Sequence, residues 1–154
     1  MGLRRKGRII AFQALYFWDV SHPELSDLLQ FTWLDEPQEE EPDNADQPER
    51  PLMPPEGARV FARLLVSGAI ENIDDIDRAI RERLEHWDFS RLSWVDRAIL
   101  RIGTYELLFR PDVPASVVID EAIAVARRFG AEDSFRFING VLDGVKRRQE
   151  GTGA

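Results

Sequence analysis

Apolar residues recur every three or four positions along most of this chain, and that spacing constrains its fold more than any other feature. Such a period is typical of amphipathic helices that bury one face. The clearest stripe, whose opposite face is charged, consists of Ile73, Ile76, Ile80, Leu84 and Trp87. No useful length of the chain alternates apolar and polar residues as a half-buried strand does. The sequence therefore predicts an all-α protein, with about seven helices in two small helical bundles.

Helix ends can also be predicted from the sequence. Residues 93–109 are apolar on nearly every side, which predicts a central helix, and Ser93 and Asp96 have the spacing of a capping box at its start. Gly130 is expected to end the next helix in a left-handed conformation. The last helix is expected to end in the cations at 146–148, which suit the carboxyl end of a helix dipole.

An acidic, proline-rich segment interrupts the helical pattern. Residues 35–50 hold eight acids and one Arg, and six of the nine prolines lie in this segment or just after it. Like charges and prolines cannot offset the entropy of ordering, so we expect residues 35–55 to be a flexible insertion. The chain is 44% hydrophobic and long enough for one core. We therefore expect a single domain over residues 1–150, with a disordered tail at 151–154.

The chain begins with a concentrated positive charge. Residues 4–8 carry four cations in five positions, whereas the formal net charge of the whole chain is -8. A frayed basic terminus and a contact with a polyanion both explain such a cluster. The apolar run at residues 9–18 should fold against a core and hold the cluster in place. A basic helix start suits phosphate groups, because free backbone N–H groups lie there too.

Few residues suggest catalytic or metal chemistry. The chain has no cysteine, and its two histidines, His22 and His86, lie in unrelated segments without a second ligand at metal-binding spacing. The acids at residues 74–77 lack the turn glycine and the final glutamate of a calcium loop. No phosphate-binding glycine loop or nucleophile motif is present. We therefore expect no enzymatic activity, no metal site and no cofactor.

The sequence does not indicate export or membrane insertion. Gln13 and Asp19 interrupt the first apolar run, which therefore does not fit a signal peptide. No segment approaches the roughly 18 unbroken apolar residues that span a bilayer. A cytoplasmic protein without membrane contact is expected.

Three blocks in the second half follow one another with the order and spacing of a known family. They are RLSWVDRAILRIGTYELLF at residues 91–109, VPASVVIDEAIAVARRFG at 113–130 and AEDSFRFINGVLDGV at 131–145. The opening RRKGRIIAFQALYFWD, which starts at Arg4, adds an arginine-rich start and an AL(Y/F) signature. Together these blocks resemble the NusB family of bacterial transcription antitermination factors.

The resemblance implies a non-enzymatic, all-α RNA-binding protein. Members of this family pair with NusE, a ribosomal small-subunit protein, and bind the boxA element of nascent RNA. The complex joins the RNA polymerase elongation complex through other Nus factors and supports transcription through ribosomal RNA operons. Relatives are both monomers and dimers, so the sequence leaves a homodimer open.

The resemblance also implies positions for the RNA contacts. The family's phosphate-contacting arm matches the basic start of this chain, and the implied contacts are Arg4, Arg5, Lys6, Arg8 and the neighbouring Gln13. Base reading is implied where the last helix begins, which in the family lies beside the arm, at Arg136, Phe137 and Asn139. Stacking on a base and packing in the core stay open for Phe135 and Phe137. Gly7 weakens a helix, so we expect the arm to order when RNA binds.

Partner binding is implied on the second-half bundle, where an acidic surface suits the basic NusE. The matching residues are Asp96, Tyr105 and Glu106. For Asp96, a helix-capping role competes with this one. Tyr105 and Glu106 fit helix core and helix surface equally well.

Two other classes of function stay open from the sequence. One is a NusB-like accessory domain related to RNA cytosine methyltransferases, which need a cofactor-binding domain downstream of the point where this sequence ends. The other is a protein-only helical adaptor that uses apolar helix faces and the acidic segment. Only the RNA-binding factor predicts a preference for boxA over a scrambled RNA.

Overall fold

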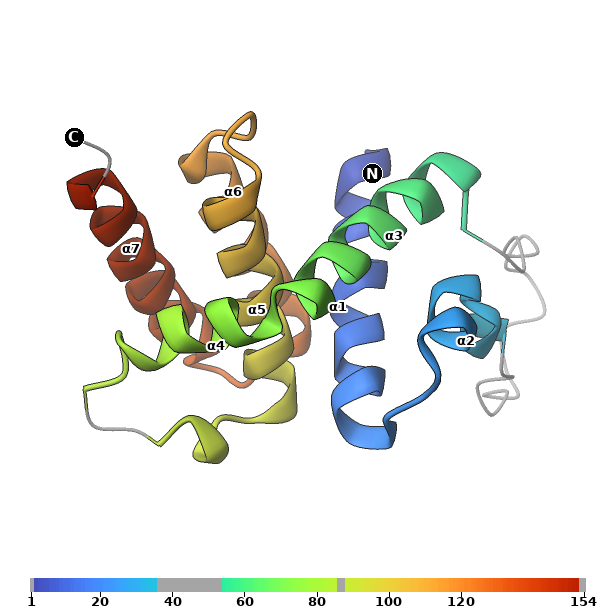
Figure 1. The fold of residues 1–154 in the computed structure, drawn as a ribbon, viewed down its shortest axis with the longest axis horizontal. Coiled ribbons are helices and arrows are strands. Elements are labelled where there is room, and N and C mark those ends of the chain that lie inside the picture. The colour runs from blue at the N-terminus through green and yellow to red at the C-terminus, as the bar shows by residue number, and fades with distance from the viewer. Residues whose placement is uncertain (1, 36–53, 86–87, 153–154) are drawn as a thin grey trace.

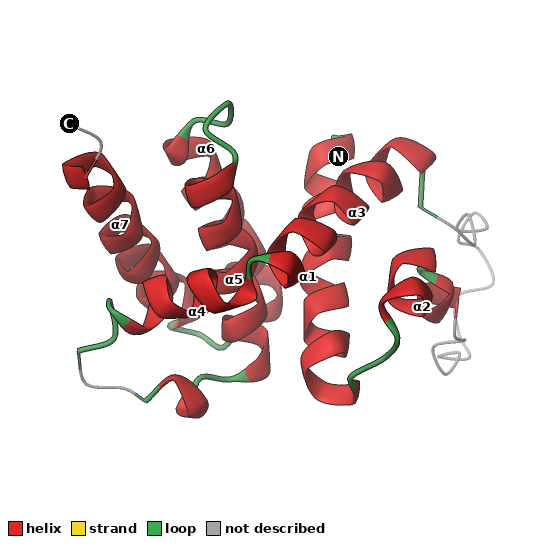
Figure 2. Cartoon of the chain, viewed as in Figure 1, coloured by secondary structure: helices red, strands yellow, loops and turns green. Residues whose placement is uncertain are grey.

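The computed structural model describes residues 2–35, 54–85 and 88–152 (Figure 1). These residues form seven α-helices and two short 3-10 helices, and none of them belongs to a strand (Figure 2). The α-helices are α1 (Leu3–Ser21), α2 (Leu25–Gln30), α3 (Glu56–Glu71), α4 (Ile73–Arg81), α5 (Trp94–Phe109), α6 (Ala115–Phe129) and α7 (Ser134–Thr152). The short helices are η1 (Thr32–Asp35) and η2 (Phe89–Arg91). The predicted all-α fold is confirmed.

The helices form two groups that meet along α5. In one group, α1 packs closely across α3, and α2 lies beside them (Figure 1). In the other, α4, α6 and α7 pack around α5. Because α5 also packs against α1 and α3, it is central to both groups. All residues from 98 to 107 are buried, as expected of a helix that is apolar on nearly every side.

Small residues let α1 and α3 approach closely. α3 buries Ala58, Ala62 and Ala69 completely. A Cβ on Gly7 of α1 would lie 2.7 Å from Phe61 Cδ1 and 3.0 Å from the Ala58 carbonyl oxygen. The start of α1 is therefore held against α3 as a helix, which corrects the expectation of an arm that orders only with RNA. One glycine weakens a helix by about 1 kcal/mol, and this packing outweighs that cost.

α6 ends where it was predicted to end but not in the predicted conformation, and α7 ends later than predicted. Gly130 follows α6 with a φ of -86°, so it is not left-handed. Glycine is needed there because a Cβ would lie 2.7 Å from the Ala126 carbonyl oxygen and 2.8 Å from Ser134 Cβ. α7 continues past the cations at 146–148 to Thr152, so these cations do not form its last turn. Residues 151–152, expected in a disordered tail, are therefore helical.

Some predictions fall outside the described residues. The acidic segment is described only at its two ends, and His86, Trp87 and residues 153–154 also lie outside. Of the predicted stripe, Ile76 and Ile80 are buried. Because residues 36–53 lie outside the described residues, the expected flexible insertion at 35–55 stays a prediction.

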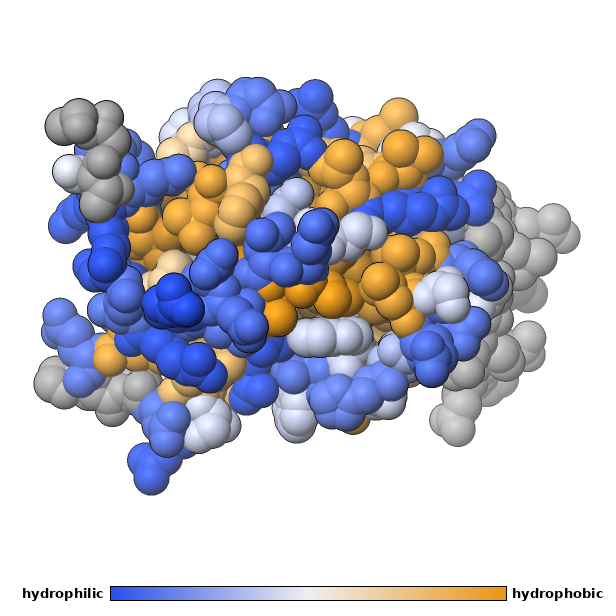
Figure 3. All heavy atoms as spheres, in the orientation of Figure 1, coloured by the Kyte–Doolittle hydropathy of each residue, from blue (hydrophilic) through white to orange (hydrophobic). Residues whose placement is uncertain are grey.

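The described surface mixes polar and apolar side chains. In the view of Figure 3, apolar atoms gather over α3 and between α6 and α7, with hydrophilic side chains around them. Val60 and Leu64 contribute to the exposed face of α3. None of the described helices combines the length and apolarity that crossing a membrane requires.

Candidate nucleic-acid interface

The basic cluster forms the first turns of α1, and its four cations differ in accessibility. Arg4 and Arg5 are exposed, Lys6 is half-buried and Arg8 is buried. The guanidinium carbons of Arg4 and Arg8 lie 6.0 and 5.3 Å from the centroid of the Phe61 ring. The four cations of the cluster therefore differ in how accessible their charge is to a ligand.

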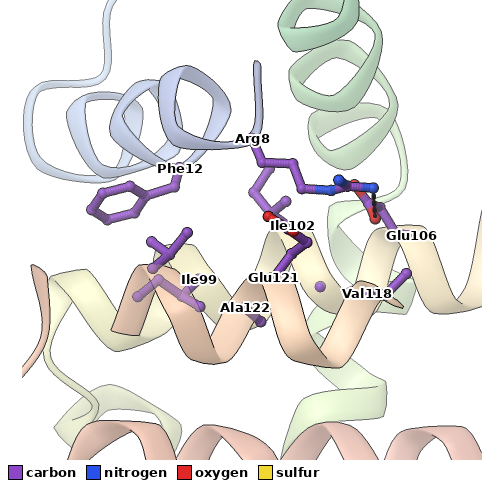
Figure 4. A pocket seen from close by; sticks show the side chains of 10 residues that line it. Arg8, Phe12, Ile99, Ile102, Glu106, Val118, Glu121 and Ala122 are labelled. Atoms are coloured by element: carbon purple, nitrogen blue, oxygen red, sulfur yellow. Dashed lines mark hydrogen bonds and ion pairs between the residues drawn. The ribbon is translucent and has the colours of Figure 1, made fainter. Parts of the chain in front are cut away.

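Arg8 lies in the interior, not on the surface where an RNA-contacting arm was expected. Its Nε and Nη2 donate to the two carboxylate oxygens of Glu106 on α5, at 2.9 and 3.2 Å. Only 8% of the Arg8 side chain and 1% of the Glu106 side chain are exposed. Figure 4 shows the pair bridging α1 and α5. Either charge would be costly to bury alone, so a phosphate that takes the Nε and Nη2 donors of Arg8 must break this pair.

Arg5 also has a carboxylate partner, Glu121 on α6. Its Nε and Nη2 donate to Glu121 Oε2 and Oε1, at 3.0 and 2.9 Å. Half of the Arg5 side chain is exposed, against 16% of Glu121. The hydrogen bonds from Arg5 hold the pKa of Glu121 below its ordinary value of 4.5, although partial burial acts in the opposite direction. The same contact raises the pKa of Arg5.

This lowered pKa predicts a pH-dependent contribution to stability. A carboxylate whose pKa is lower in the folded chain stabilises the fold above its unfolded pKa, and the contribution is lost as the pH falls through the folded pKa. We expect the unfolding free energy of the wild type to exceed that of Glu121→Gln above about pH 5. The gap should close as the pH falls below 4.5. Urea unfolding at a series of pH values measures it, and a gap that persists at about pH 2 would contradict the assignment.

Arg4 and Lys6, unlike Arg5 and Arg8, form no ion pair with another described residue. They lie beside the first backbone N–H groups of α1, and Gly2 at the N-cap provides no side-chain hydrogen bond to them. An uncapped helix amino terminus attracts anions through its free N–H groups and its dipole. This end of α1 is therefore the most anion-attracting part of the described arm.

A small cavity lies where α1, α5 and α6 meet, next to both ion pairs (Figure 4). Its volume is about 20 Å³. Most of its lining is apolar, and it includes Phe12, Ile99, Ile102, Val118, Ala122 and Val125. Such a space holds about one water molecule and no nucleotide base. A polyanion at this end of the molecule therefore binds on the surface.

Aromatic and basic side chains gather where α7 begins. Arg136 and Asn139 are exposed, whereas Phe135 and Phe137 are half-buried and packed against the core. The guanidinium carbons of Arg127 and Arg136 lie 4.6 and 5.4 Å from the centroid of the Phe135 ring. Both phenylalanines therefore pack on the core and keep part of their surface exposed, so the choice between core and stacking is not exclusive.

Phe137 and Asp96 line one surface hollow of about 410 Å³, together with Arg91 and Asp133. The Asp96 backbone N–H donates to Ser93 Oγ at 3.1 Å, which confirms Ser93 as the predicted cap of α5. Asp96 Oδ1 is buried and has no hydrogen-bond partner among the described residues. A residue implied for the protein partner and a residue implied for RNA thus lie in the same hollow.

The start of α7 does not lie beside the basic arm, which corrects what the resemblance implied. Arg5 pairs with Glu121 in the middle of α6, whereas Phe12 contacts Phe129 at the end of α6, with ring centroids 5.1 Å apart. α1 and α6 therefore run in the same direction, and α7 begins beyond the far end of α6 (Figure 1). Half-buried Gln13 lies on α1 between the basic arm and the start of α7, about 12 Å along the helix from Arg5.

Tyr105 and Glu106, for which core and surface were both open, belong to the core. Tyr105 is 8% exposed, and its ring occupies the space that a Cβ on Gly68 would need. It also stacks on Phe109, with ring centroids 5.6 Å apart. Glu106 is 1% exposed and paired with Arg8. Of the three residues implied for the partner, only Asp96 reaches a surface hollow.

Sequence reasoning missed two residues of this region, Glu121 and Arg127. Both belong to the block at 113–130, which predicted a helix end at Gly130 and contributed to the family resemblance but suggested no site residue. Glu121 is 116 positions away from Arg5, so no local pattern could have paired them. Arg127 carried a weak signal, because it is a cation at the end of the helix that precedes the aromatic block.

The fold and the site define a class: an all-α protein of two helix groups with an uncapped basic helix terminus. In the part of the chain that is described, no group of three His, Asp or Glu could hold a metal ion.

A family model described as the NusB family matches residues 5–147. A relative from Treponema pallidum (strain Nichols), called transcription antitermination protein NusB, is 48% identical over 143 residues, 92% of this chain and 91% of its own.

Two solved structures share this fold. The structure of T. maritima NusB is 35% identical with a TM-score of 0.74, and the match covers 98% of this chain and 97% of that one. A structure of the antitermination factors NusB and NusE in complex with dsRNA is 25% identical with a TM-score of 0.77, covering 95% and 97%. This chain therefore belongs to the NusB family, whose members are non-enzymatic transcription antitermination factors.

Proposed function

We propose that this chain binds boxA RNA together with NusE, joins the RNA polymerase elongation complex through other Nus factors and supports transcription through ribosomal RNA operons. One observation carries the RNA contact: Arg4 and Lys6 lie at an uncapped helix start without an ion pair to another described residue. A relative with this fold, bound to NusE and dsRNA, supports the choice of partners. The expected place of action is the cytoplasm, where bacterial transcription takes place.

The arm supplies affinity without sequence preference in this proposal. Phosphate oxygens carry no base identity, so contacts from Arg4 and Lys6 hold any RNA. Arg5 adds a contact when a phosphate replaces Glu121. Arg8 is needed to hold α1 on α5 through Glu106, and its phosphate contact would require that buried pair to open.

Base reading belongs to the start of α7 in this proposal. Exposed Asn139 can bond a base edge through its amide, and Arg136 can bond or stack. Half-buried Phe137 offers a ring face, and one base stacked on an aromatic side chain contributes about 1–3 kcal/mol. RNA that reaches both the arm and this region runs along α1 past Gln13.

The hollow at Asp96 suits a basic protein partner such as NusE. Its buried Oδ1 lacks a donor among the described residues, and Glu132 and Asp133 line the same hollow. A lysine or arginine of the partner would pair with the exposed carboxylates of Glu132 and Asp133 and balance the acidic charge, whereas the buried Asp96 Oδ1 would be reached only if the rim of the hollow moved. Tyr105 and Glu106 would affect the partner indirectly, by fixing α5.

Arg4→Ala combined with Lys6→Ala tests the arm. Removing two phosphate contacts should weaken the binding of boxA and of a scrambled RNA alike, while the preference for boxA is kept. The slope of log affinity against log salt should become shallower by about 1.4, since each single-stranded phosphate contact contributes about 0.7. Anisotropy titrations of labelled RNA at several salt concentrations, with and without NusE, measure both quantities.

A charge-matched control is Arg78→Ala combined with Arg147→Ala. These arginines form exposed ion pairs within α4 and α7, and their loss should leave RNA binding close to that of the wild type. If the variant with Arg4→Ala and Lys6→Ala bound RNA with wild-type affinity, the arm would be ruled out as an RNA contact. A wild type that prefers boxA neither alone nor with NusE would instead favour the protein-only adaptor.

A further inference from the structure

The two arginine–carboxylate pairs of the arm differ in how easily a ligand can open them. The Arg8–Glu106 pair is enclosed, with 8% and 1% of the side chains exposed. The Arg5–Glu121 pair is open, with half of Arg5 exposed. Exposed ion pairs contribute little stability and exchange partners readily, whereas separating a buried pair leaves uncompensated charge. Arg5 is therefore the paired arm residue whose partner a ligand can replace.

Glu121 occupies the edge of Arg5 that a phosphate would use. Nε and Nη2 form one edge of the guanidinium group, which binds a carboxylate or a phosphate through two parallel hydrogen bonds. In this structure both atoms donate to Glu121, at 3.0 and 2.9 Å. An RNA phosphate that binds this edge must displace the Glu121 carboxylate. That carboxylate, 16% exposed, would then lose its hydrogen-bonded counter-charge beside a polyanion and keep only the attraction of Arg8, which is itself paired with Glu106.

We propose that Glu121 competes with RNA phosphate for Arg5 and thereby lowers the affinity of the arm for polyanions. The inference rests on the proposed function, because it requires that the arm contacts RNA. In the free protein the Glu121 carboxylate occupies the edge of Arg5 that a phosphate would use and neutralises its charge. Arg5 therefore contributes little long-range attraction for RNA. Arg4 and Lys6 make the first contact, and Arg5 follows when a phosphate lies close enough to replace the carboxylate. Because phosphate carries no base identity, Glu121 sets affinity and not sequence preference.

Glu121→Gln tests the competition, because it removes the charge and keeps the size of the side chain. We expect boxA and scrambled RNA to bind about two- to fivefold more tightly, the fold-change that corresponds to losing an exposed competing ion pair. The salt slope should become steeper by about 0.7, because the released Arg5 makes a full phosphate contact. Asp120→Asn is the matched control: it makes the same charge change on the neighbouring exposed residue of α6, which has no ion pair to a described residue. It should change neither quantity.

A direct readout is the pKa of Glu121, followed by NMR of its labelled carboxyl group in the free protein and in the boxA complex. It should rise on binding, as Arg5 moves to the phosphate. An unchanged pKa, or equal tightening by Glu121→Gln and Asp120→Asn, would overturn the competition. Weaker RNA binding by Glu121→Gln would overturn it too, since Glu121 would then orient Arg5 for RNA. Circular dichroism checks folding, and Glu121→Ala is a second variant with the same expectation.

Failure of this inference is distinguishable from failure of the proposed function. If the wild type prefers boxA and the Arg4 and Lys6 variant binds weakly, but Glu121→Gln does not tighten binding, only the competition is wrong. If the wild type shows no preference for boxA and the arm variant binds as the wild type does, the proposed function itself is wrong.

Discussion

Arg101→Met should lower the free energy of unfolding by about 3–5 kcal/mol, because it leaves the buried Asp77 carboxylate without a counter-charge, whereas Asp19 keeps its pair with Arg97. Arg101 Nε and Nη2 donate to the two carboxylate oxygens of Asp77, both at 2.9 Å. Its Nη1 lies 3.2 Å from Asp19 Oδ2, an ion-pair distance. Only 6% of the Arg101 side chain and 12% of each of the two carboxylate side chains are exposed. Little water is therefore available to replace the lost charge.

The position of this network explains the size of the expected effect. It joins α1 through Asp19, α4 through Asp77 and α5 through Arg101, where the two helix groups meet. The rings of Trp18 and Phe89 lie 5.5 and 5.4 Å from the Arg101 guanidinium carbon and help to exclude water from it. Loss of Arg101 therefore weakens the junction of the two groups.

Urea unfolding followed by circular dichroism measures the loss, with an m-value that should not change. Arg78→Met is the matched control, since its pair with Asp75 is exposed and should contribute less than about 0.5 kcal/mol. Combining Arg101→Met with Asp77→Leu should recover part of the stability, because it removes the carboxylate that lost its counter-charge, while Asp19 stays paired with Arg97. A loss as small as that of the control would show that the network is not needed at this junction.

Arg8→Met should cost a similar amount, about 3–5 kcal/mol, because Glu106 would remain charged and almost fully buried. Replacing both residues, with Arg8→Met and Glu106→Leu together, should recover much of this loss. Apolar side chains of similar volume often substitute for a buried ion pair at little cost, since neither charge then has to leave water.

A double-mutant cycle of unfolding free energies measures this coupling. Additive losses from the two single changes would show that the pair contributes nothing as a pair. The double variant also isolates the RNA contact expected of Arg8. If Arg8 only holds α1 on α5, the folded double variant should bind boxA as the wild type does, whereas a loss as large as that of the Arg4 and Lys6 variant would assign Arg8 to the RNA.

Much of the fold could be predicted because it depends on local patterns. Helical periodicity reports which face of a segment is apolar, and α5, apolar on nearly every side, is buried from residue 98 to residue 107. The cap at Ser93 was predictable because it needs only two nearby residues. The end of α6 at Gly130 was predictable in position but not in conformation, because glycine is required there by the closeness of Ser134 and not by a positive φ.

In the candidate site, too, local features could be predicted from the sequence, whereas features set by tertiary contacts could not. The basic start of α1, the aromatic block at the start of α7 and the order of the family blocks are all properties of contiguous residues. Which of those residues face a ligand is not such a property. Phe135 and Phe137 both pack on the core with part of the ring exposed, a result that depends on how α7 lies on its neighbours.

By itself, therefore, the sequence determined an all-α chain of the NusB family with a cation-rich helix start, because periodicity, charge and motif order are carried along the chain. Only the tertiary structure decided which cations are free to act. Arg8 and Arg5 pair with carboxylates 98 and 116 positions away, while Arg4 and Lys6 form no ion pair within the described chain. The physical reason is that the availability of a charge depends on which opposite charge the fold brings within hydrogen-bonding distance, and on how much water reaches the pair.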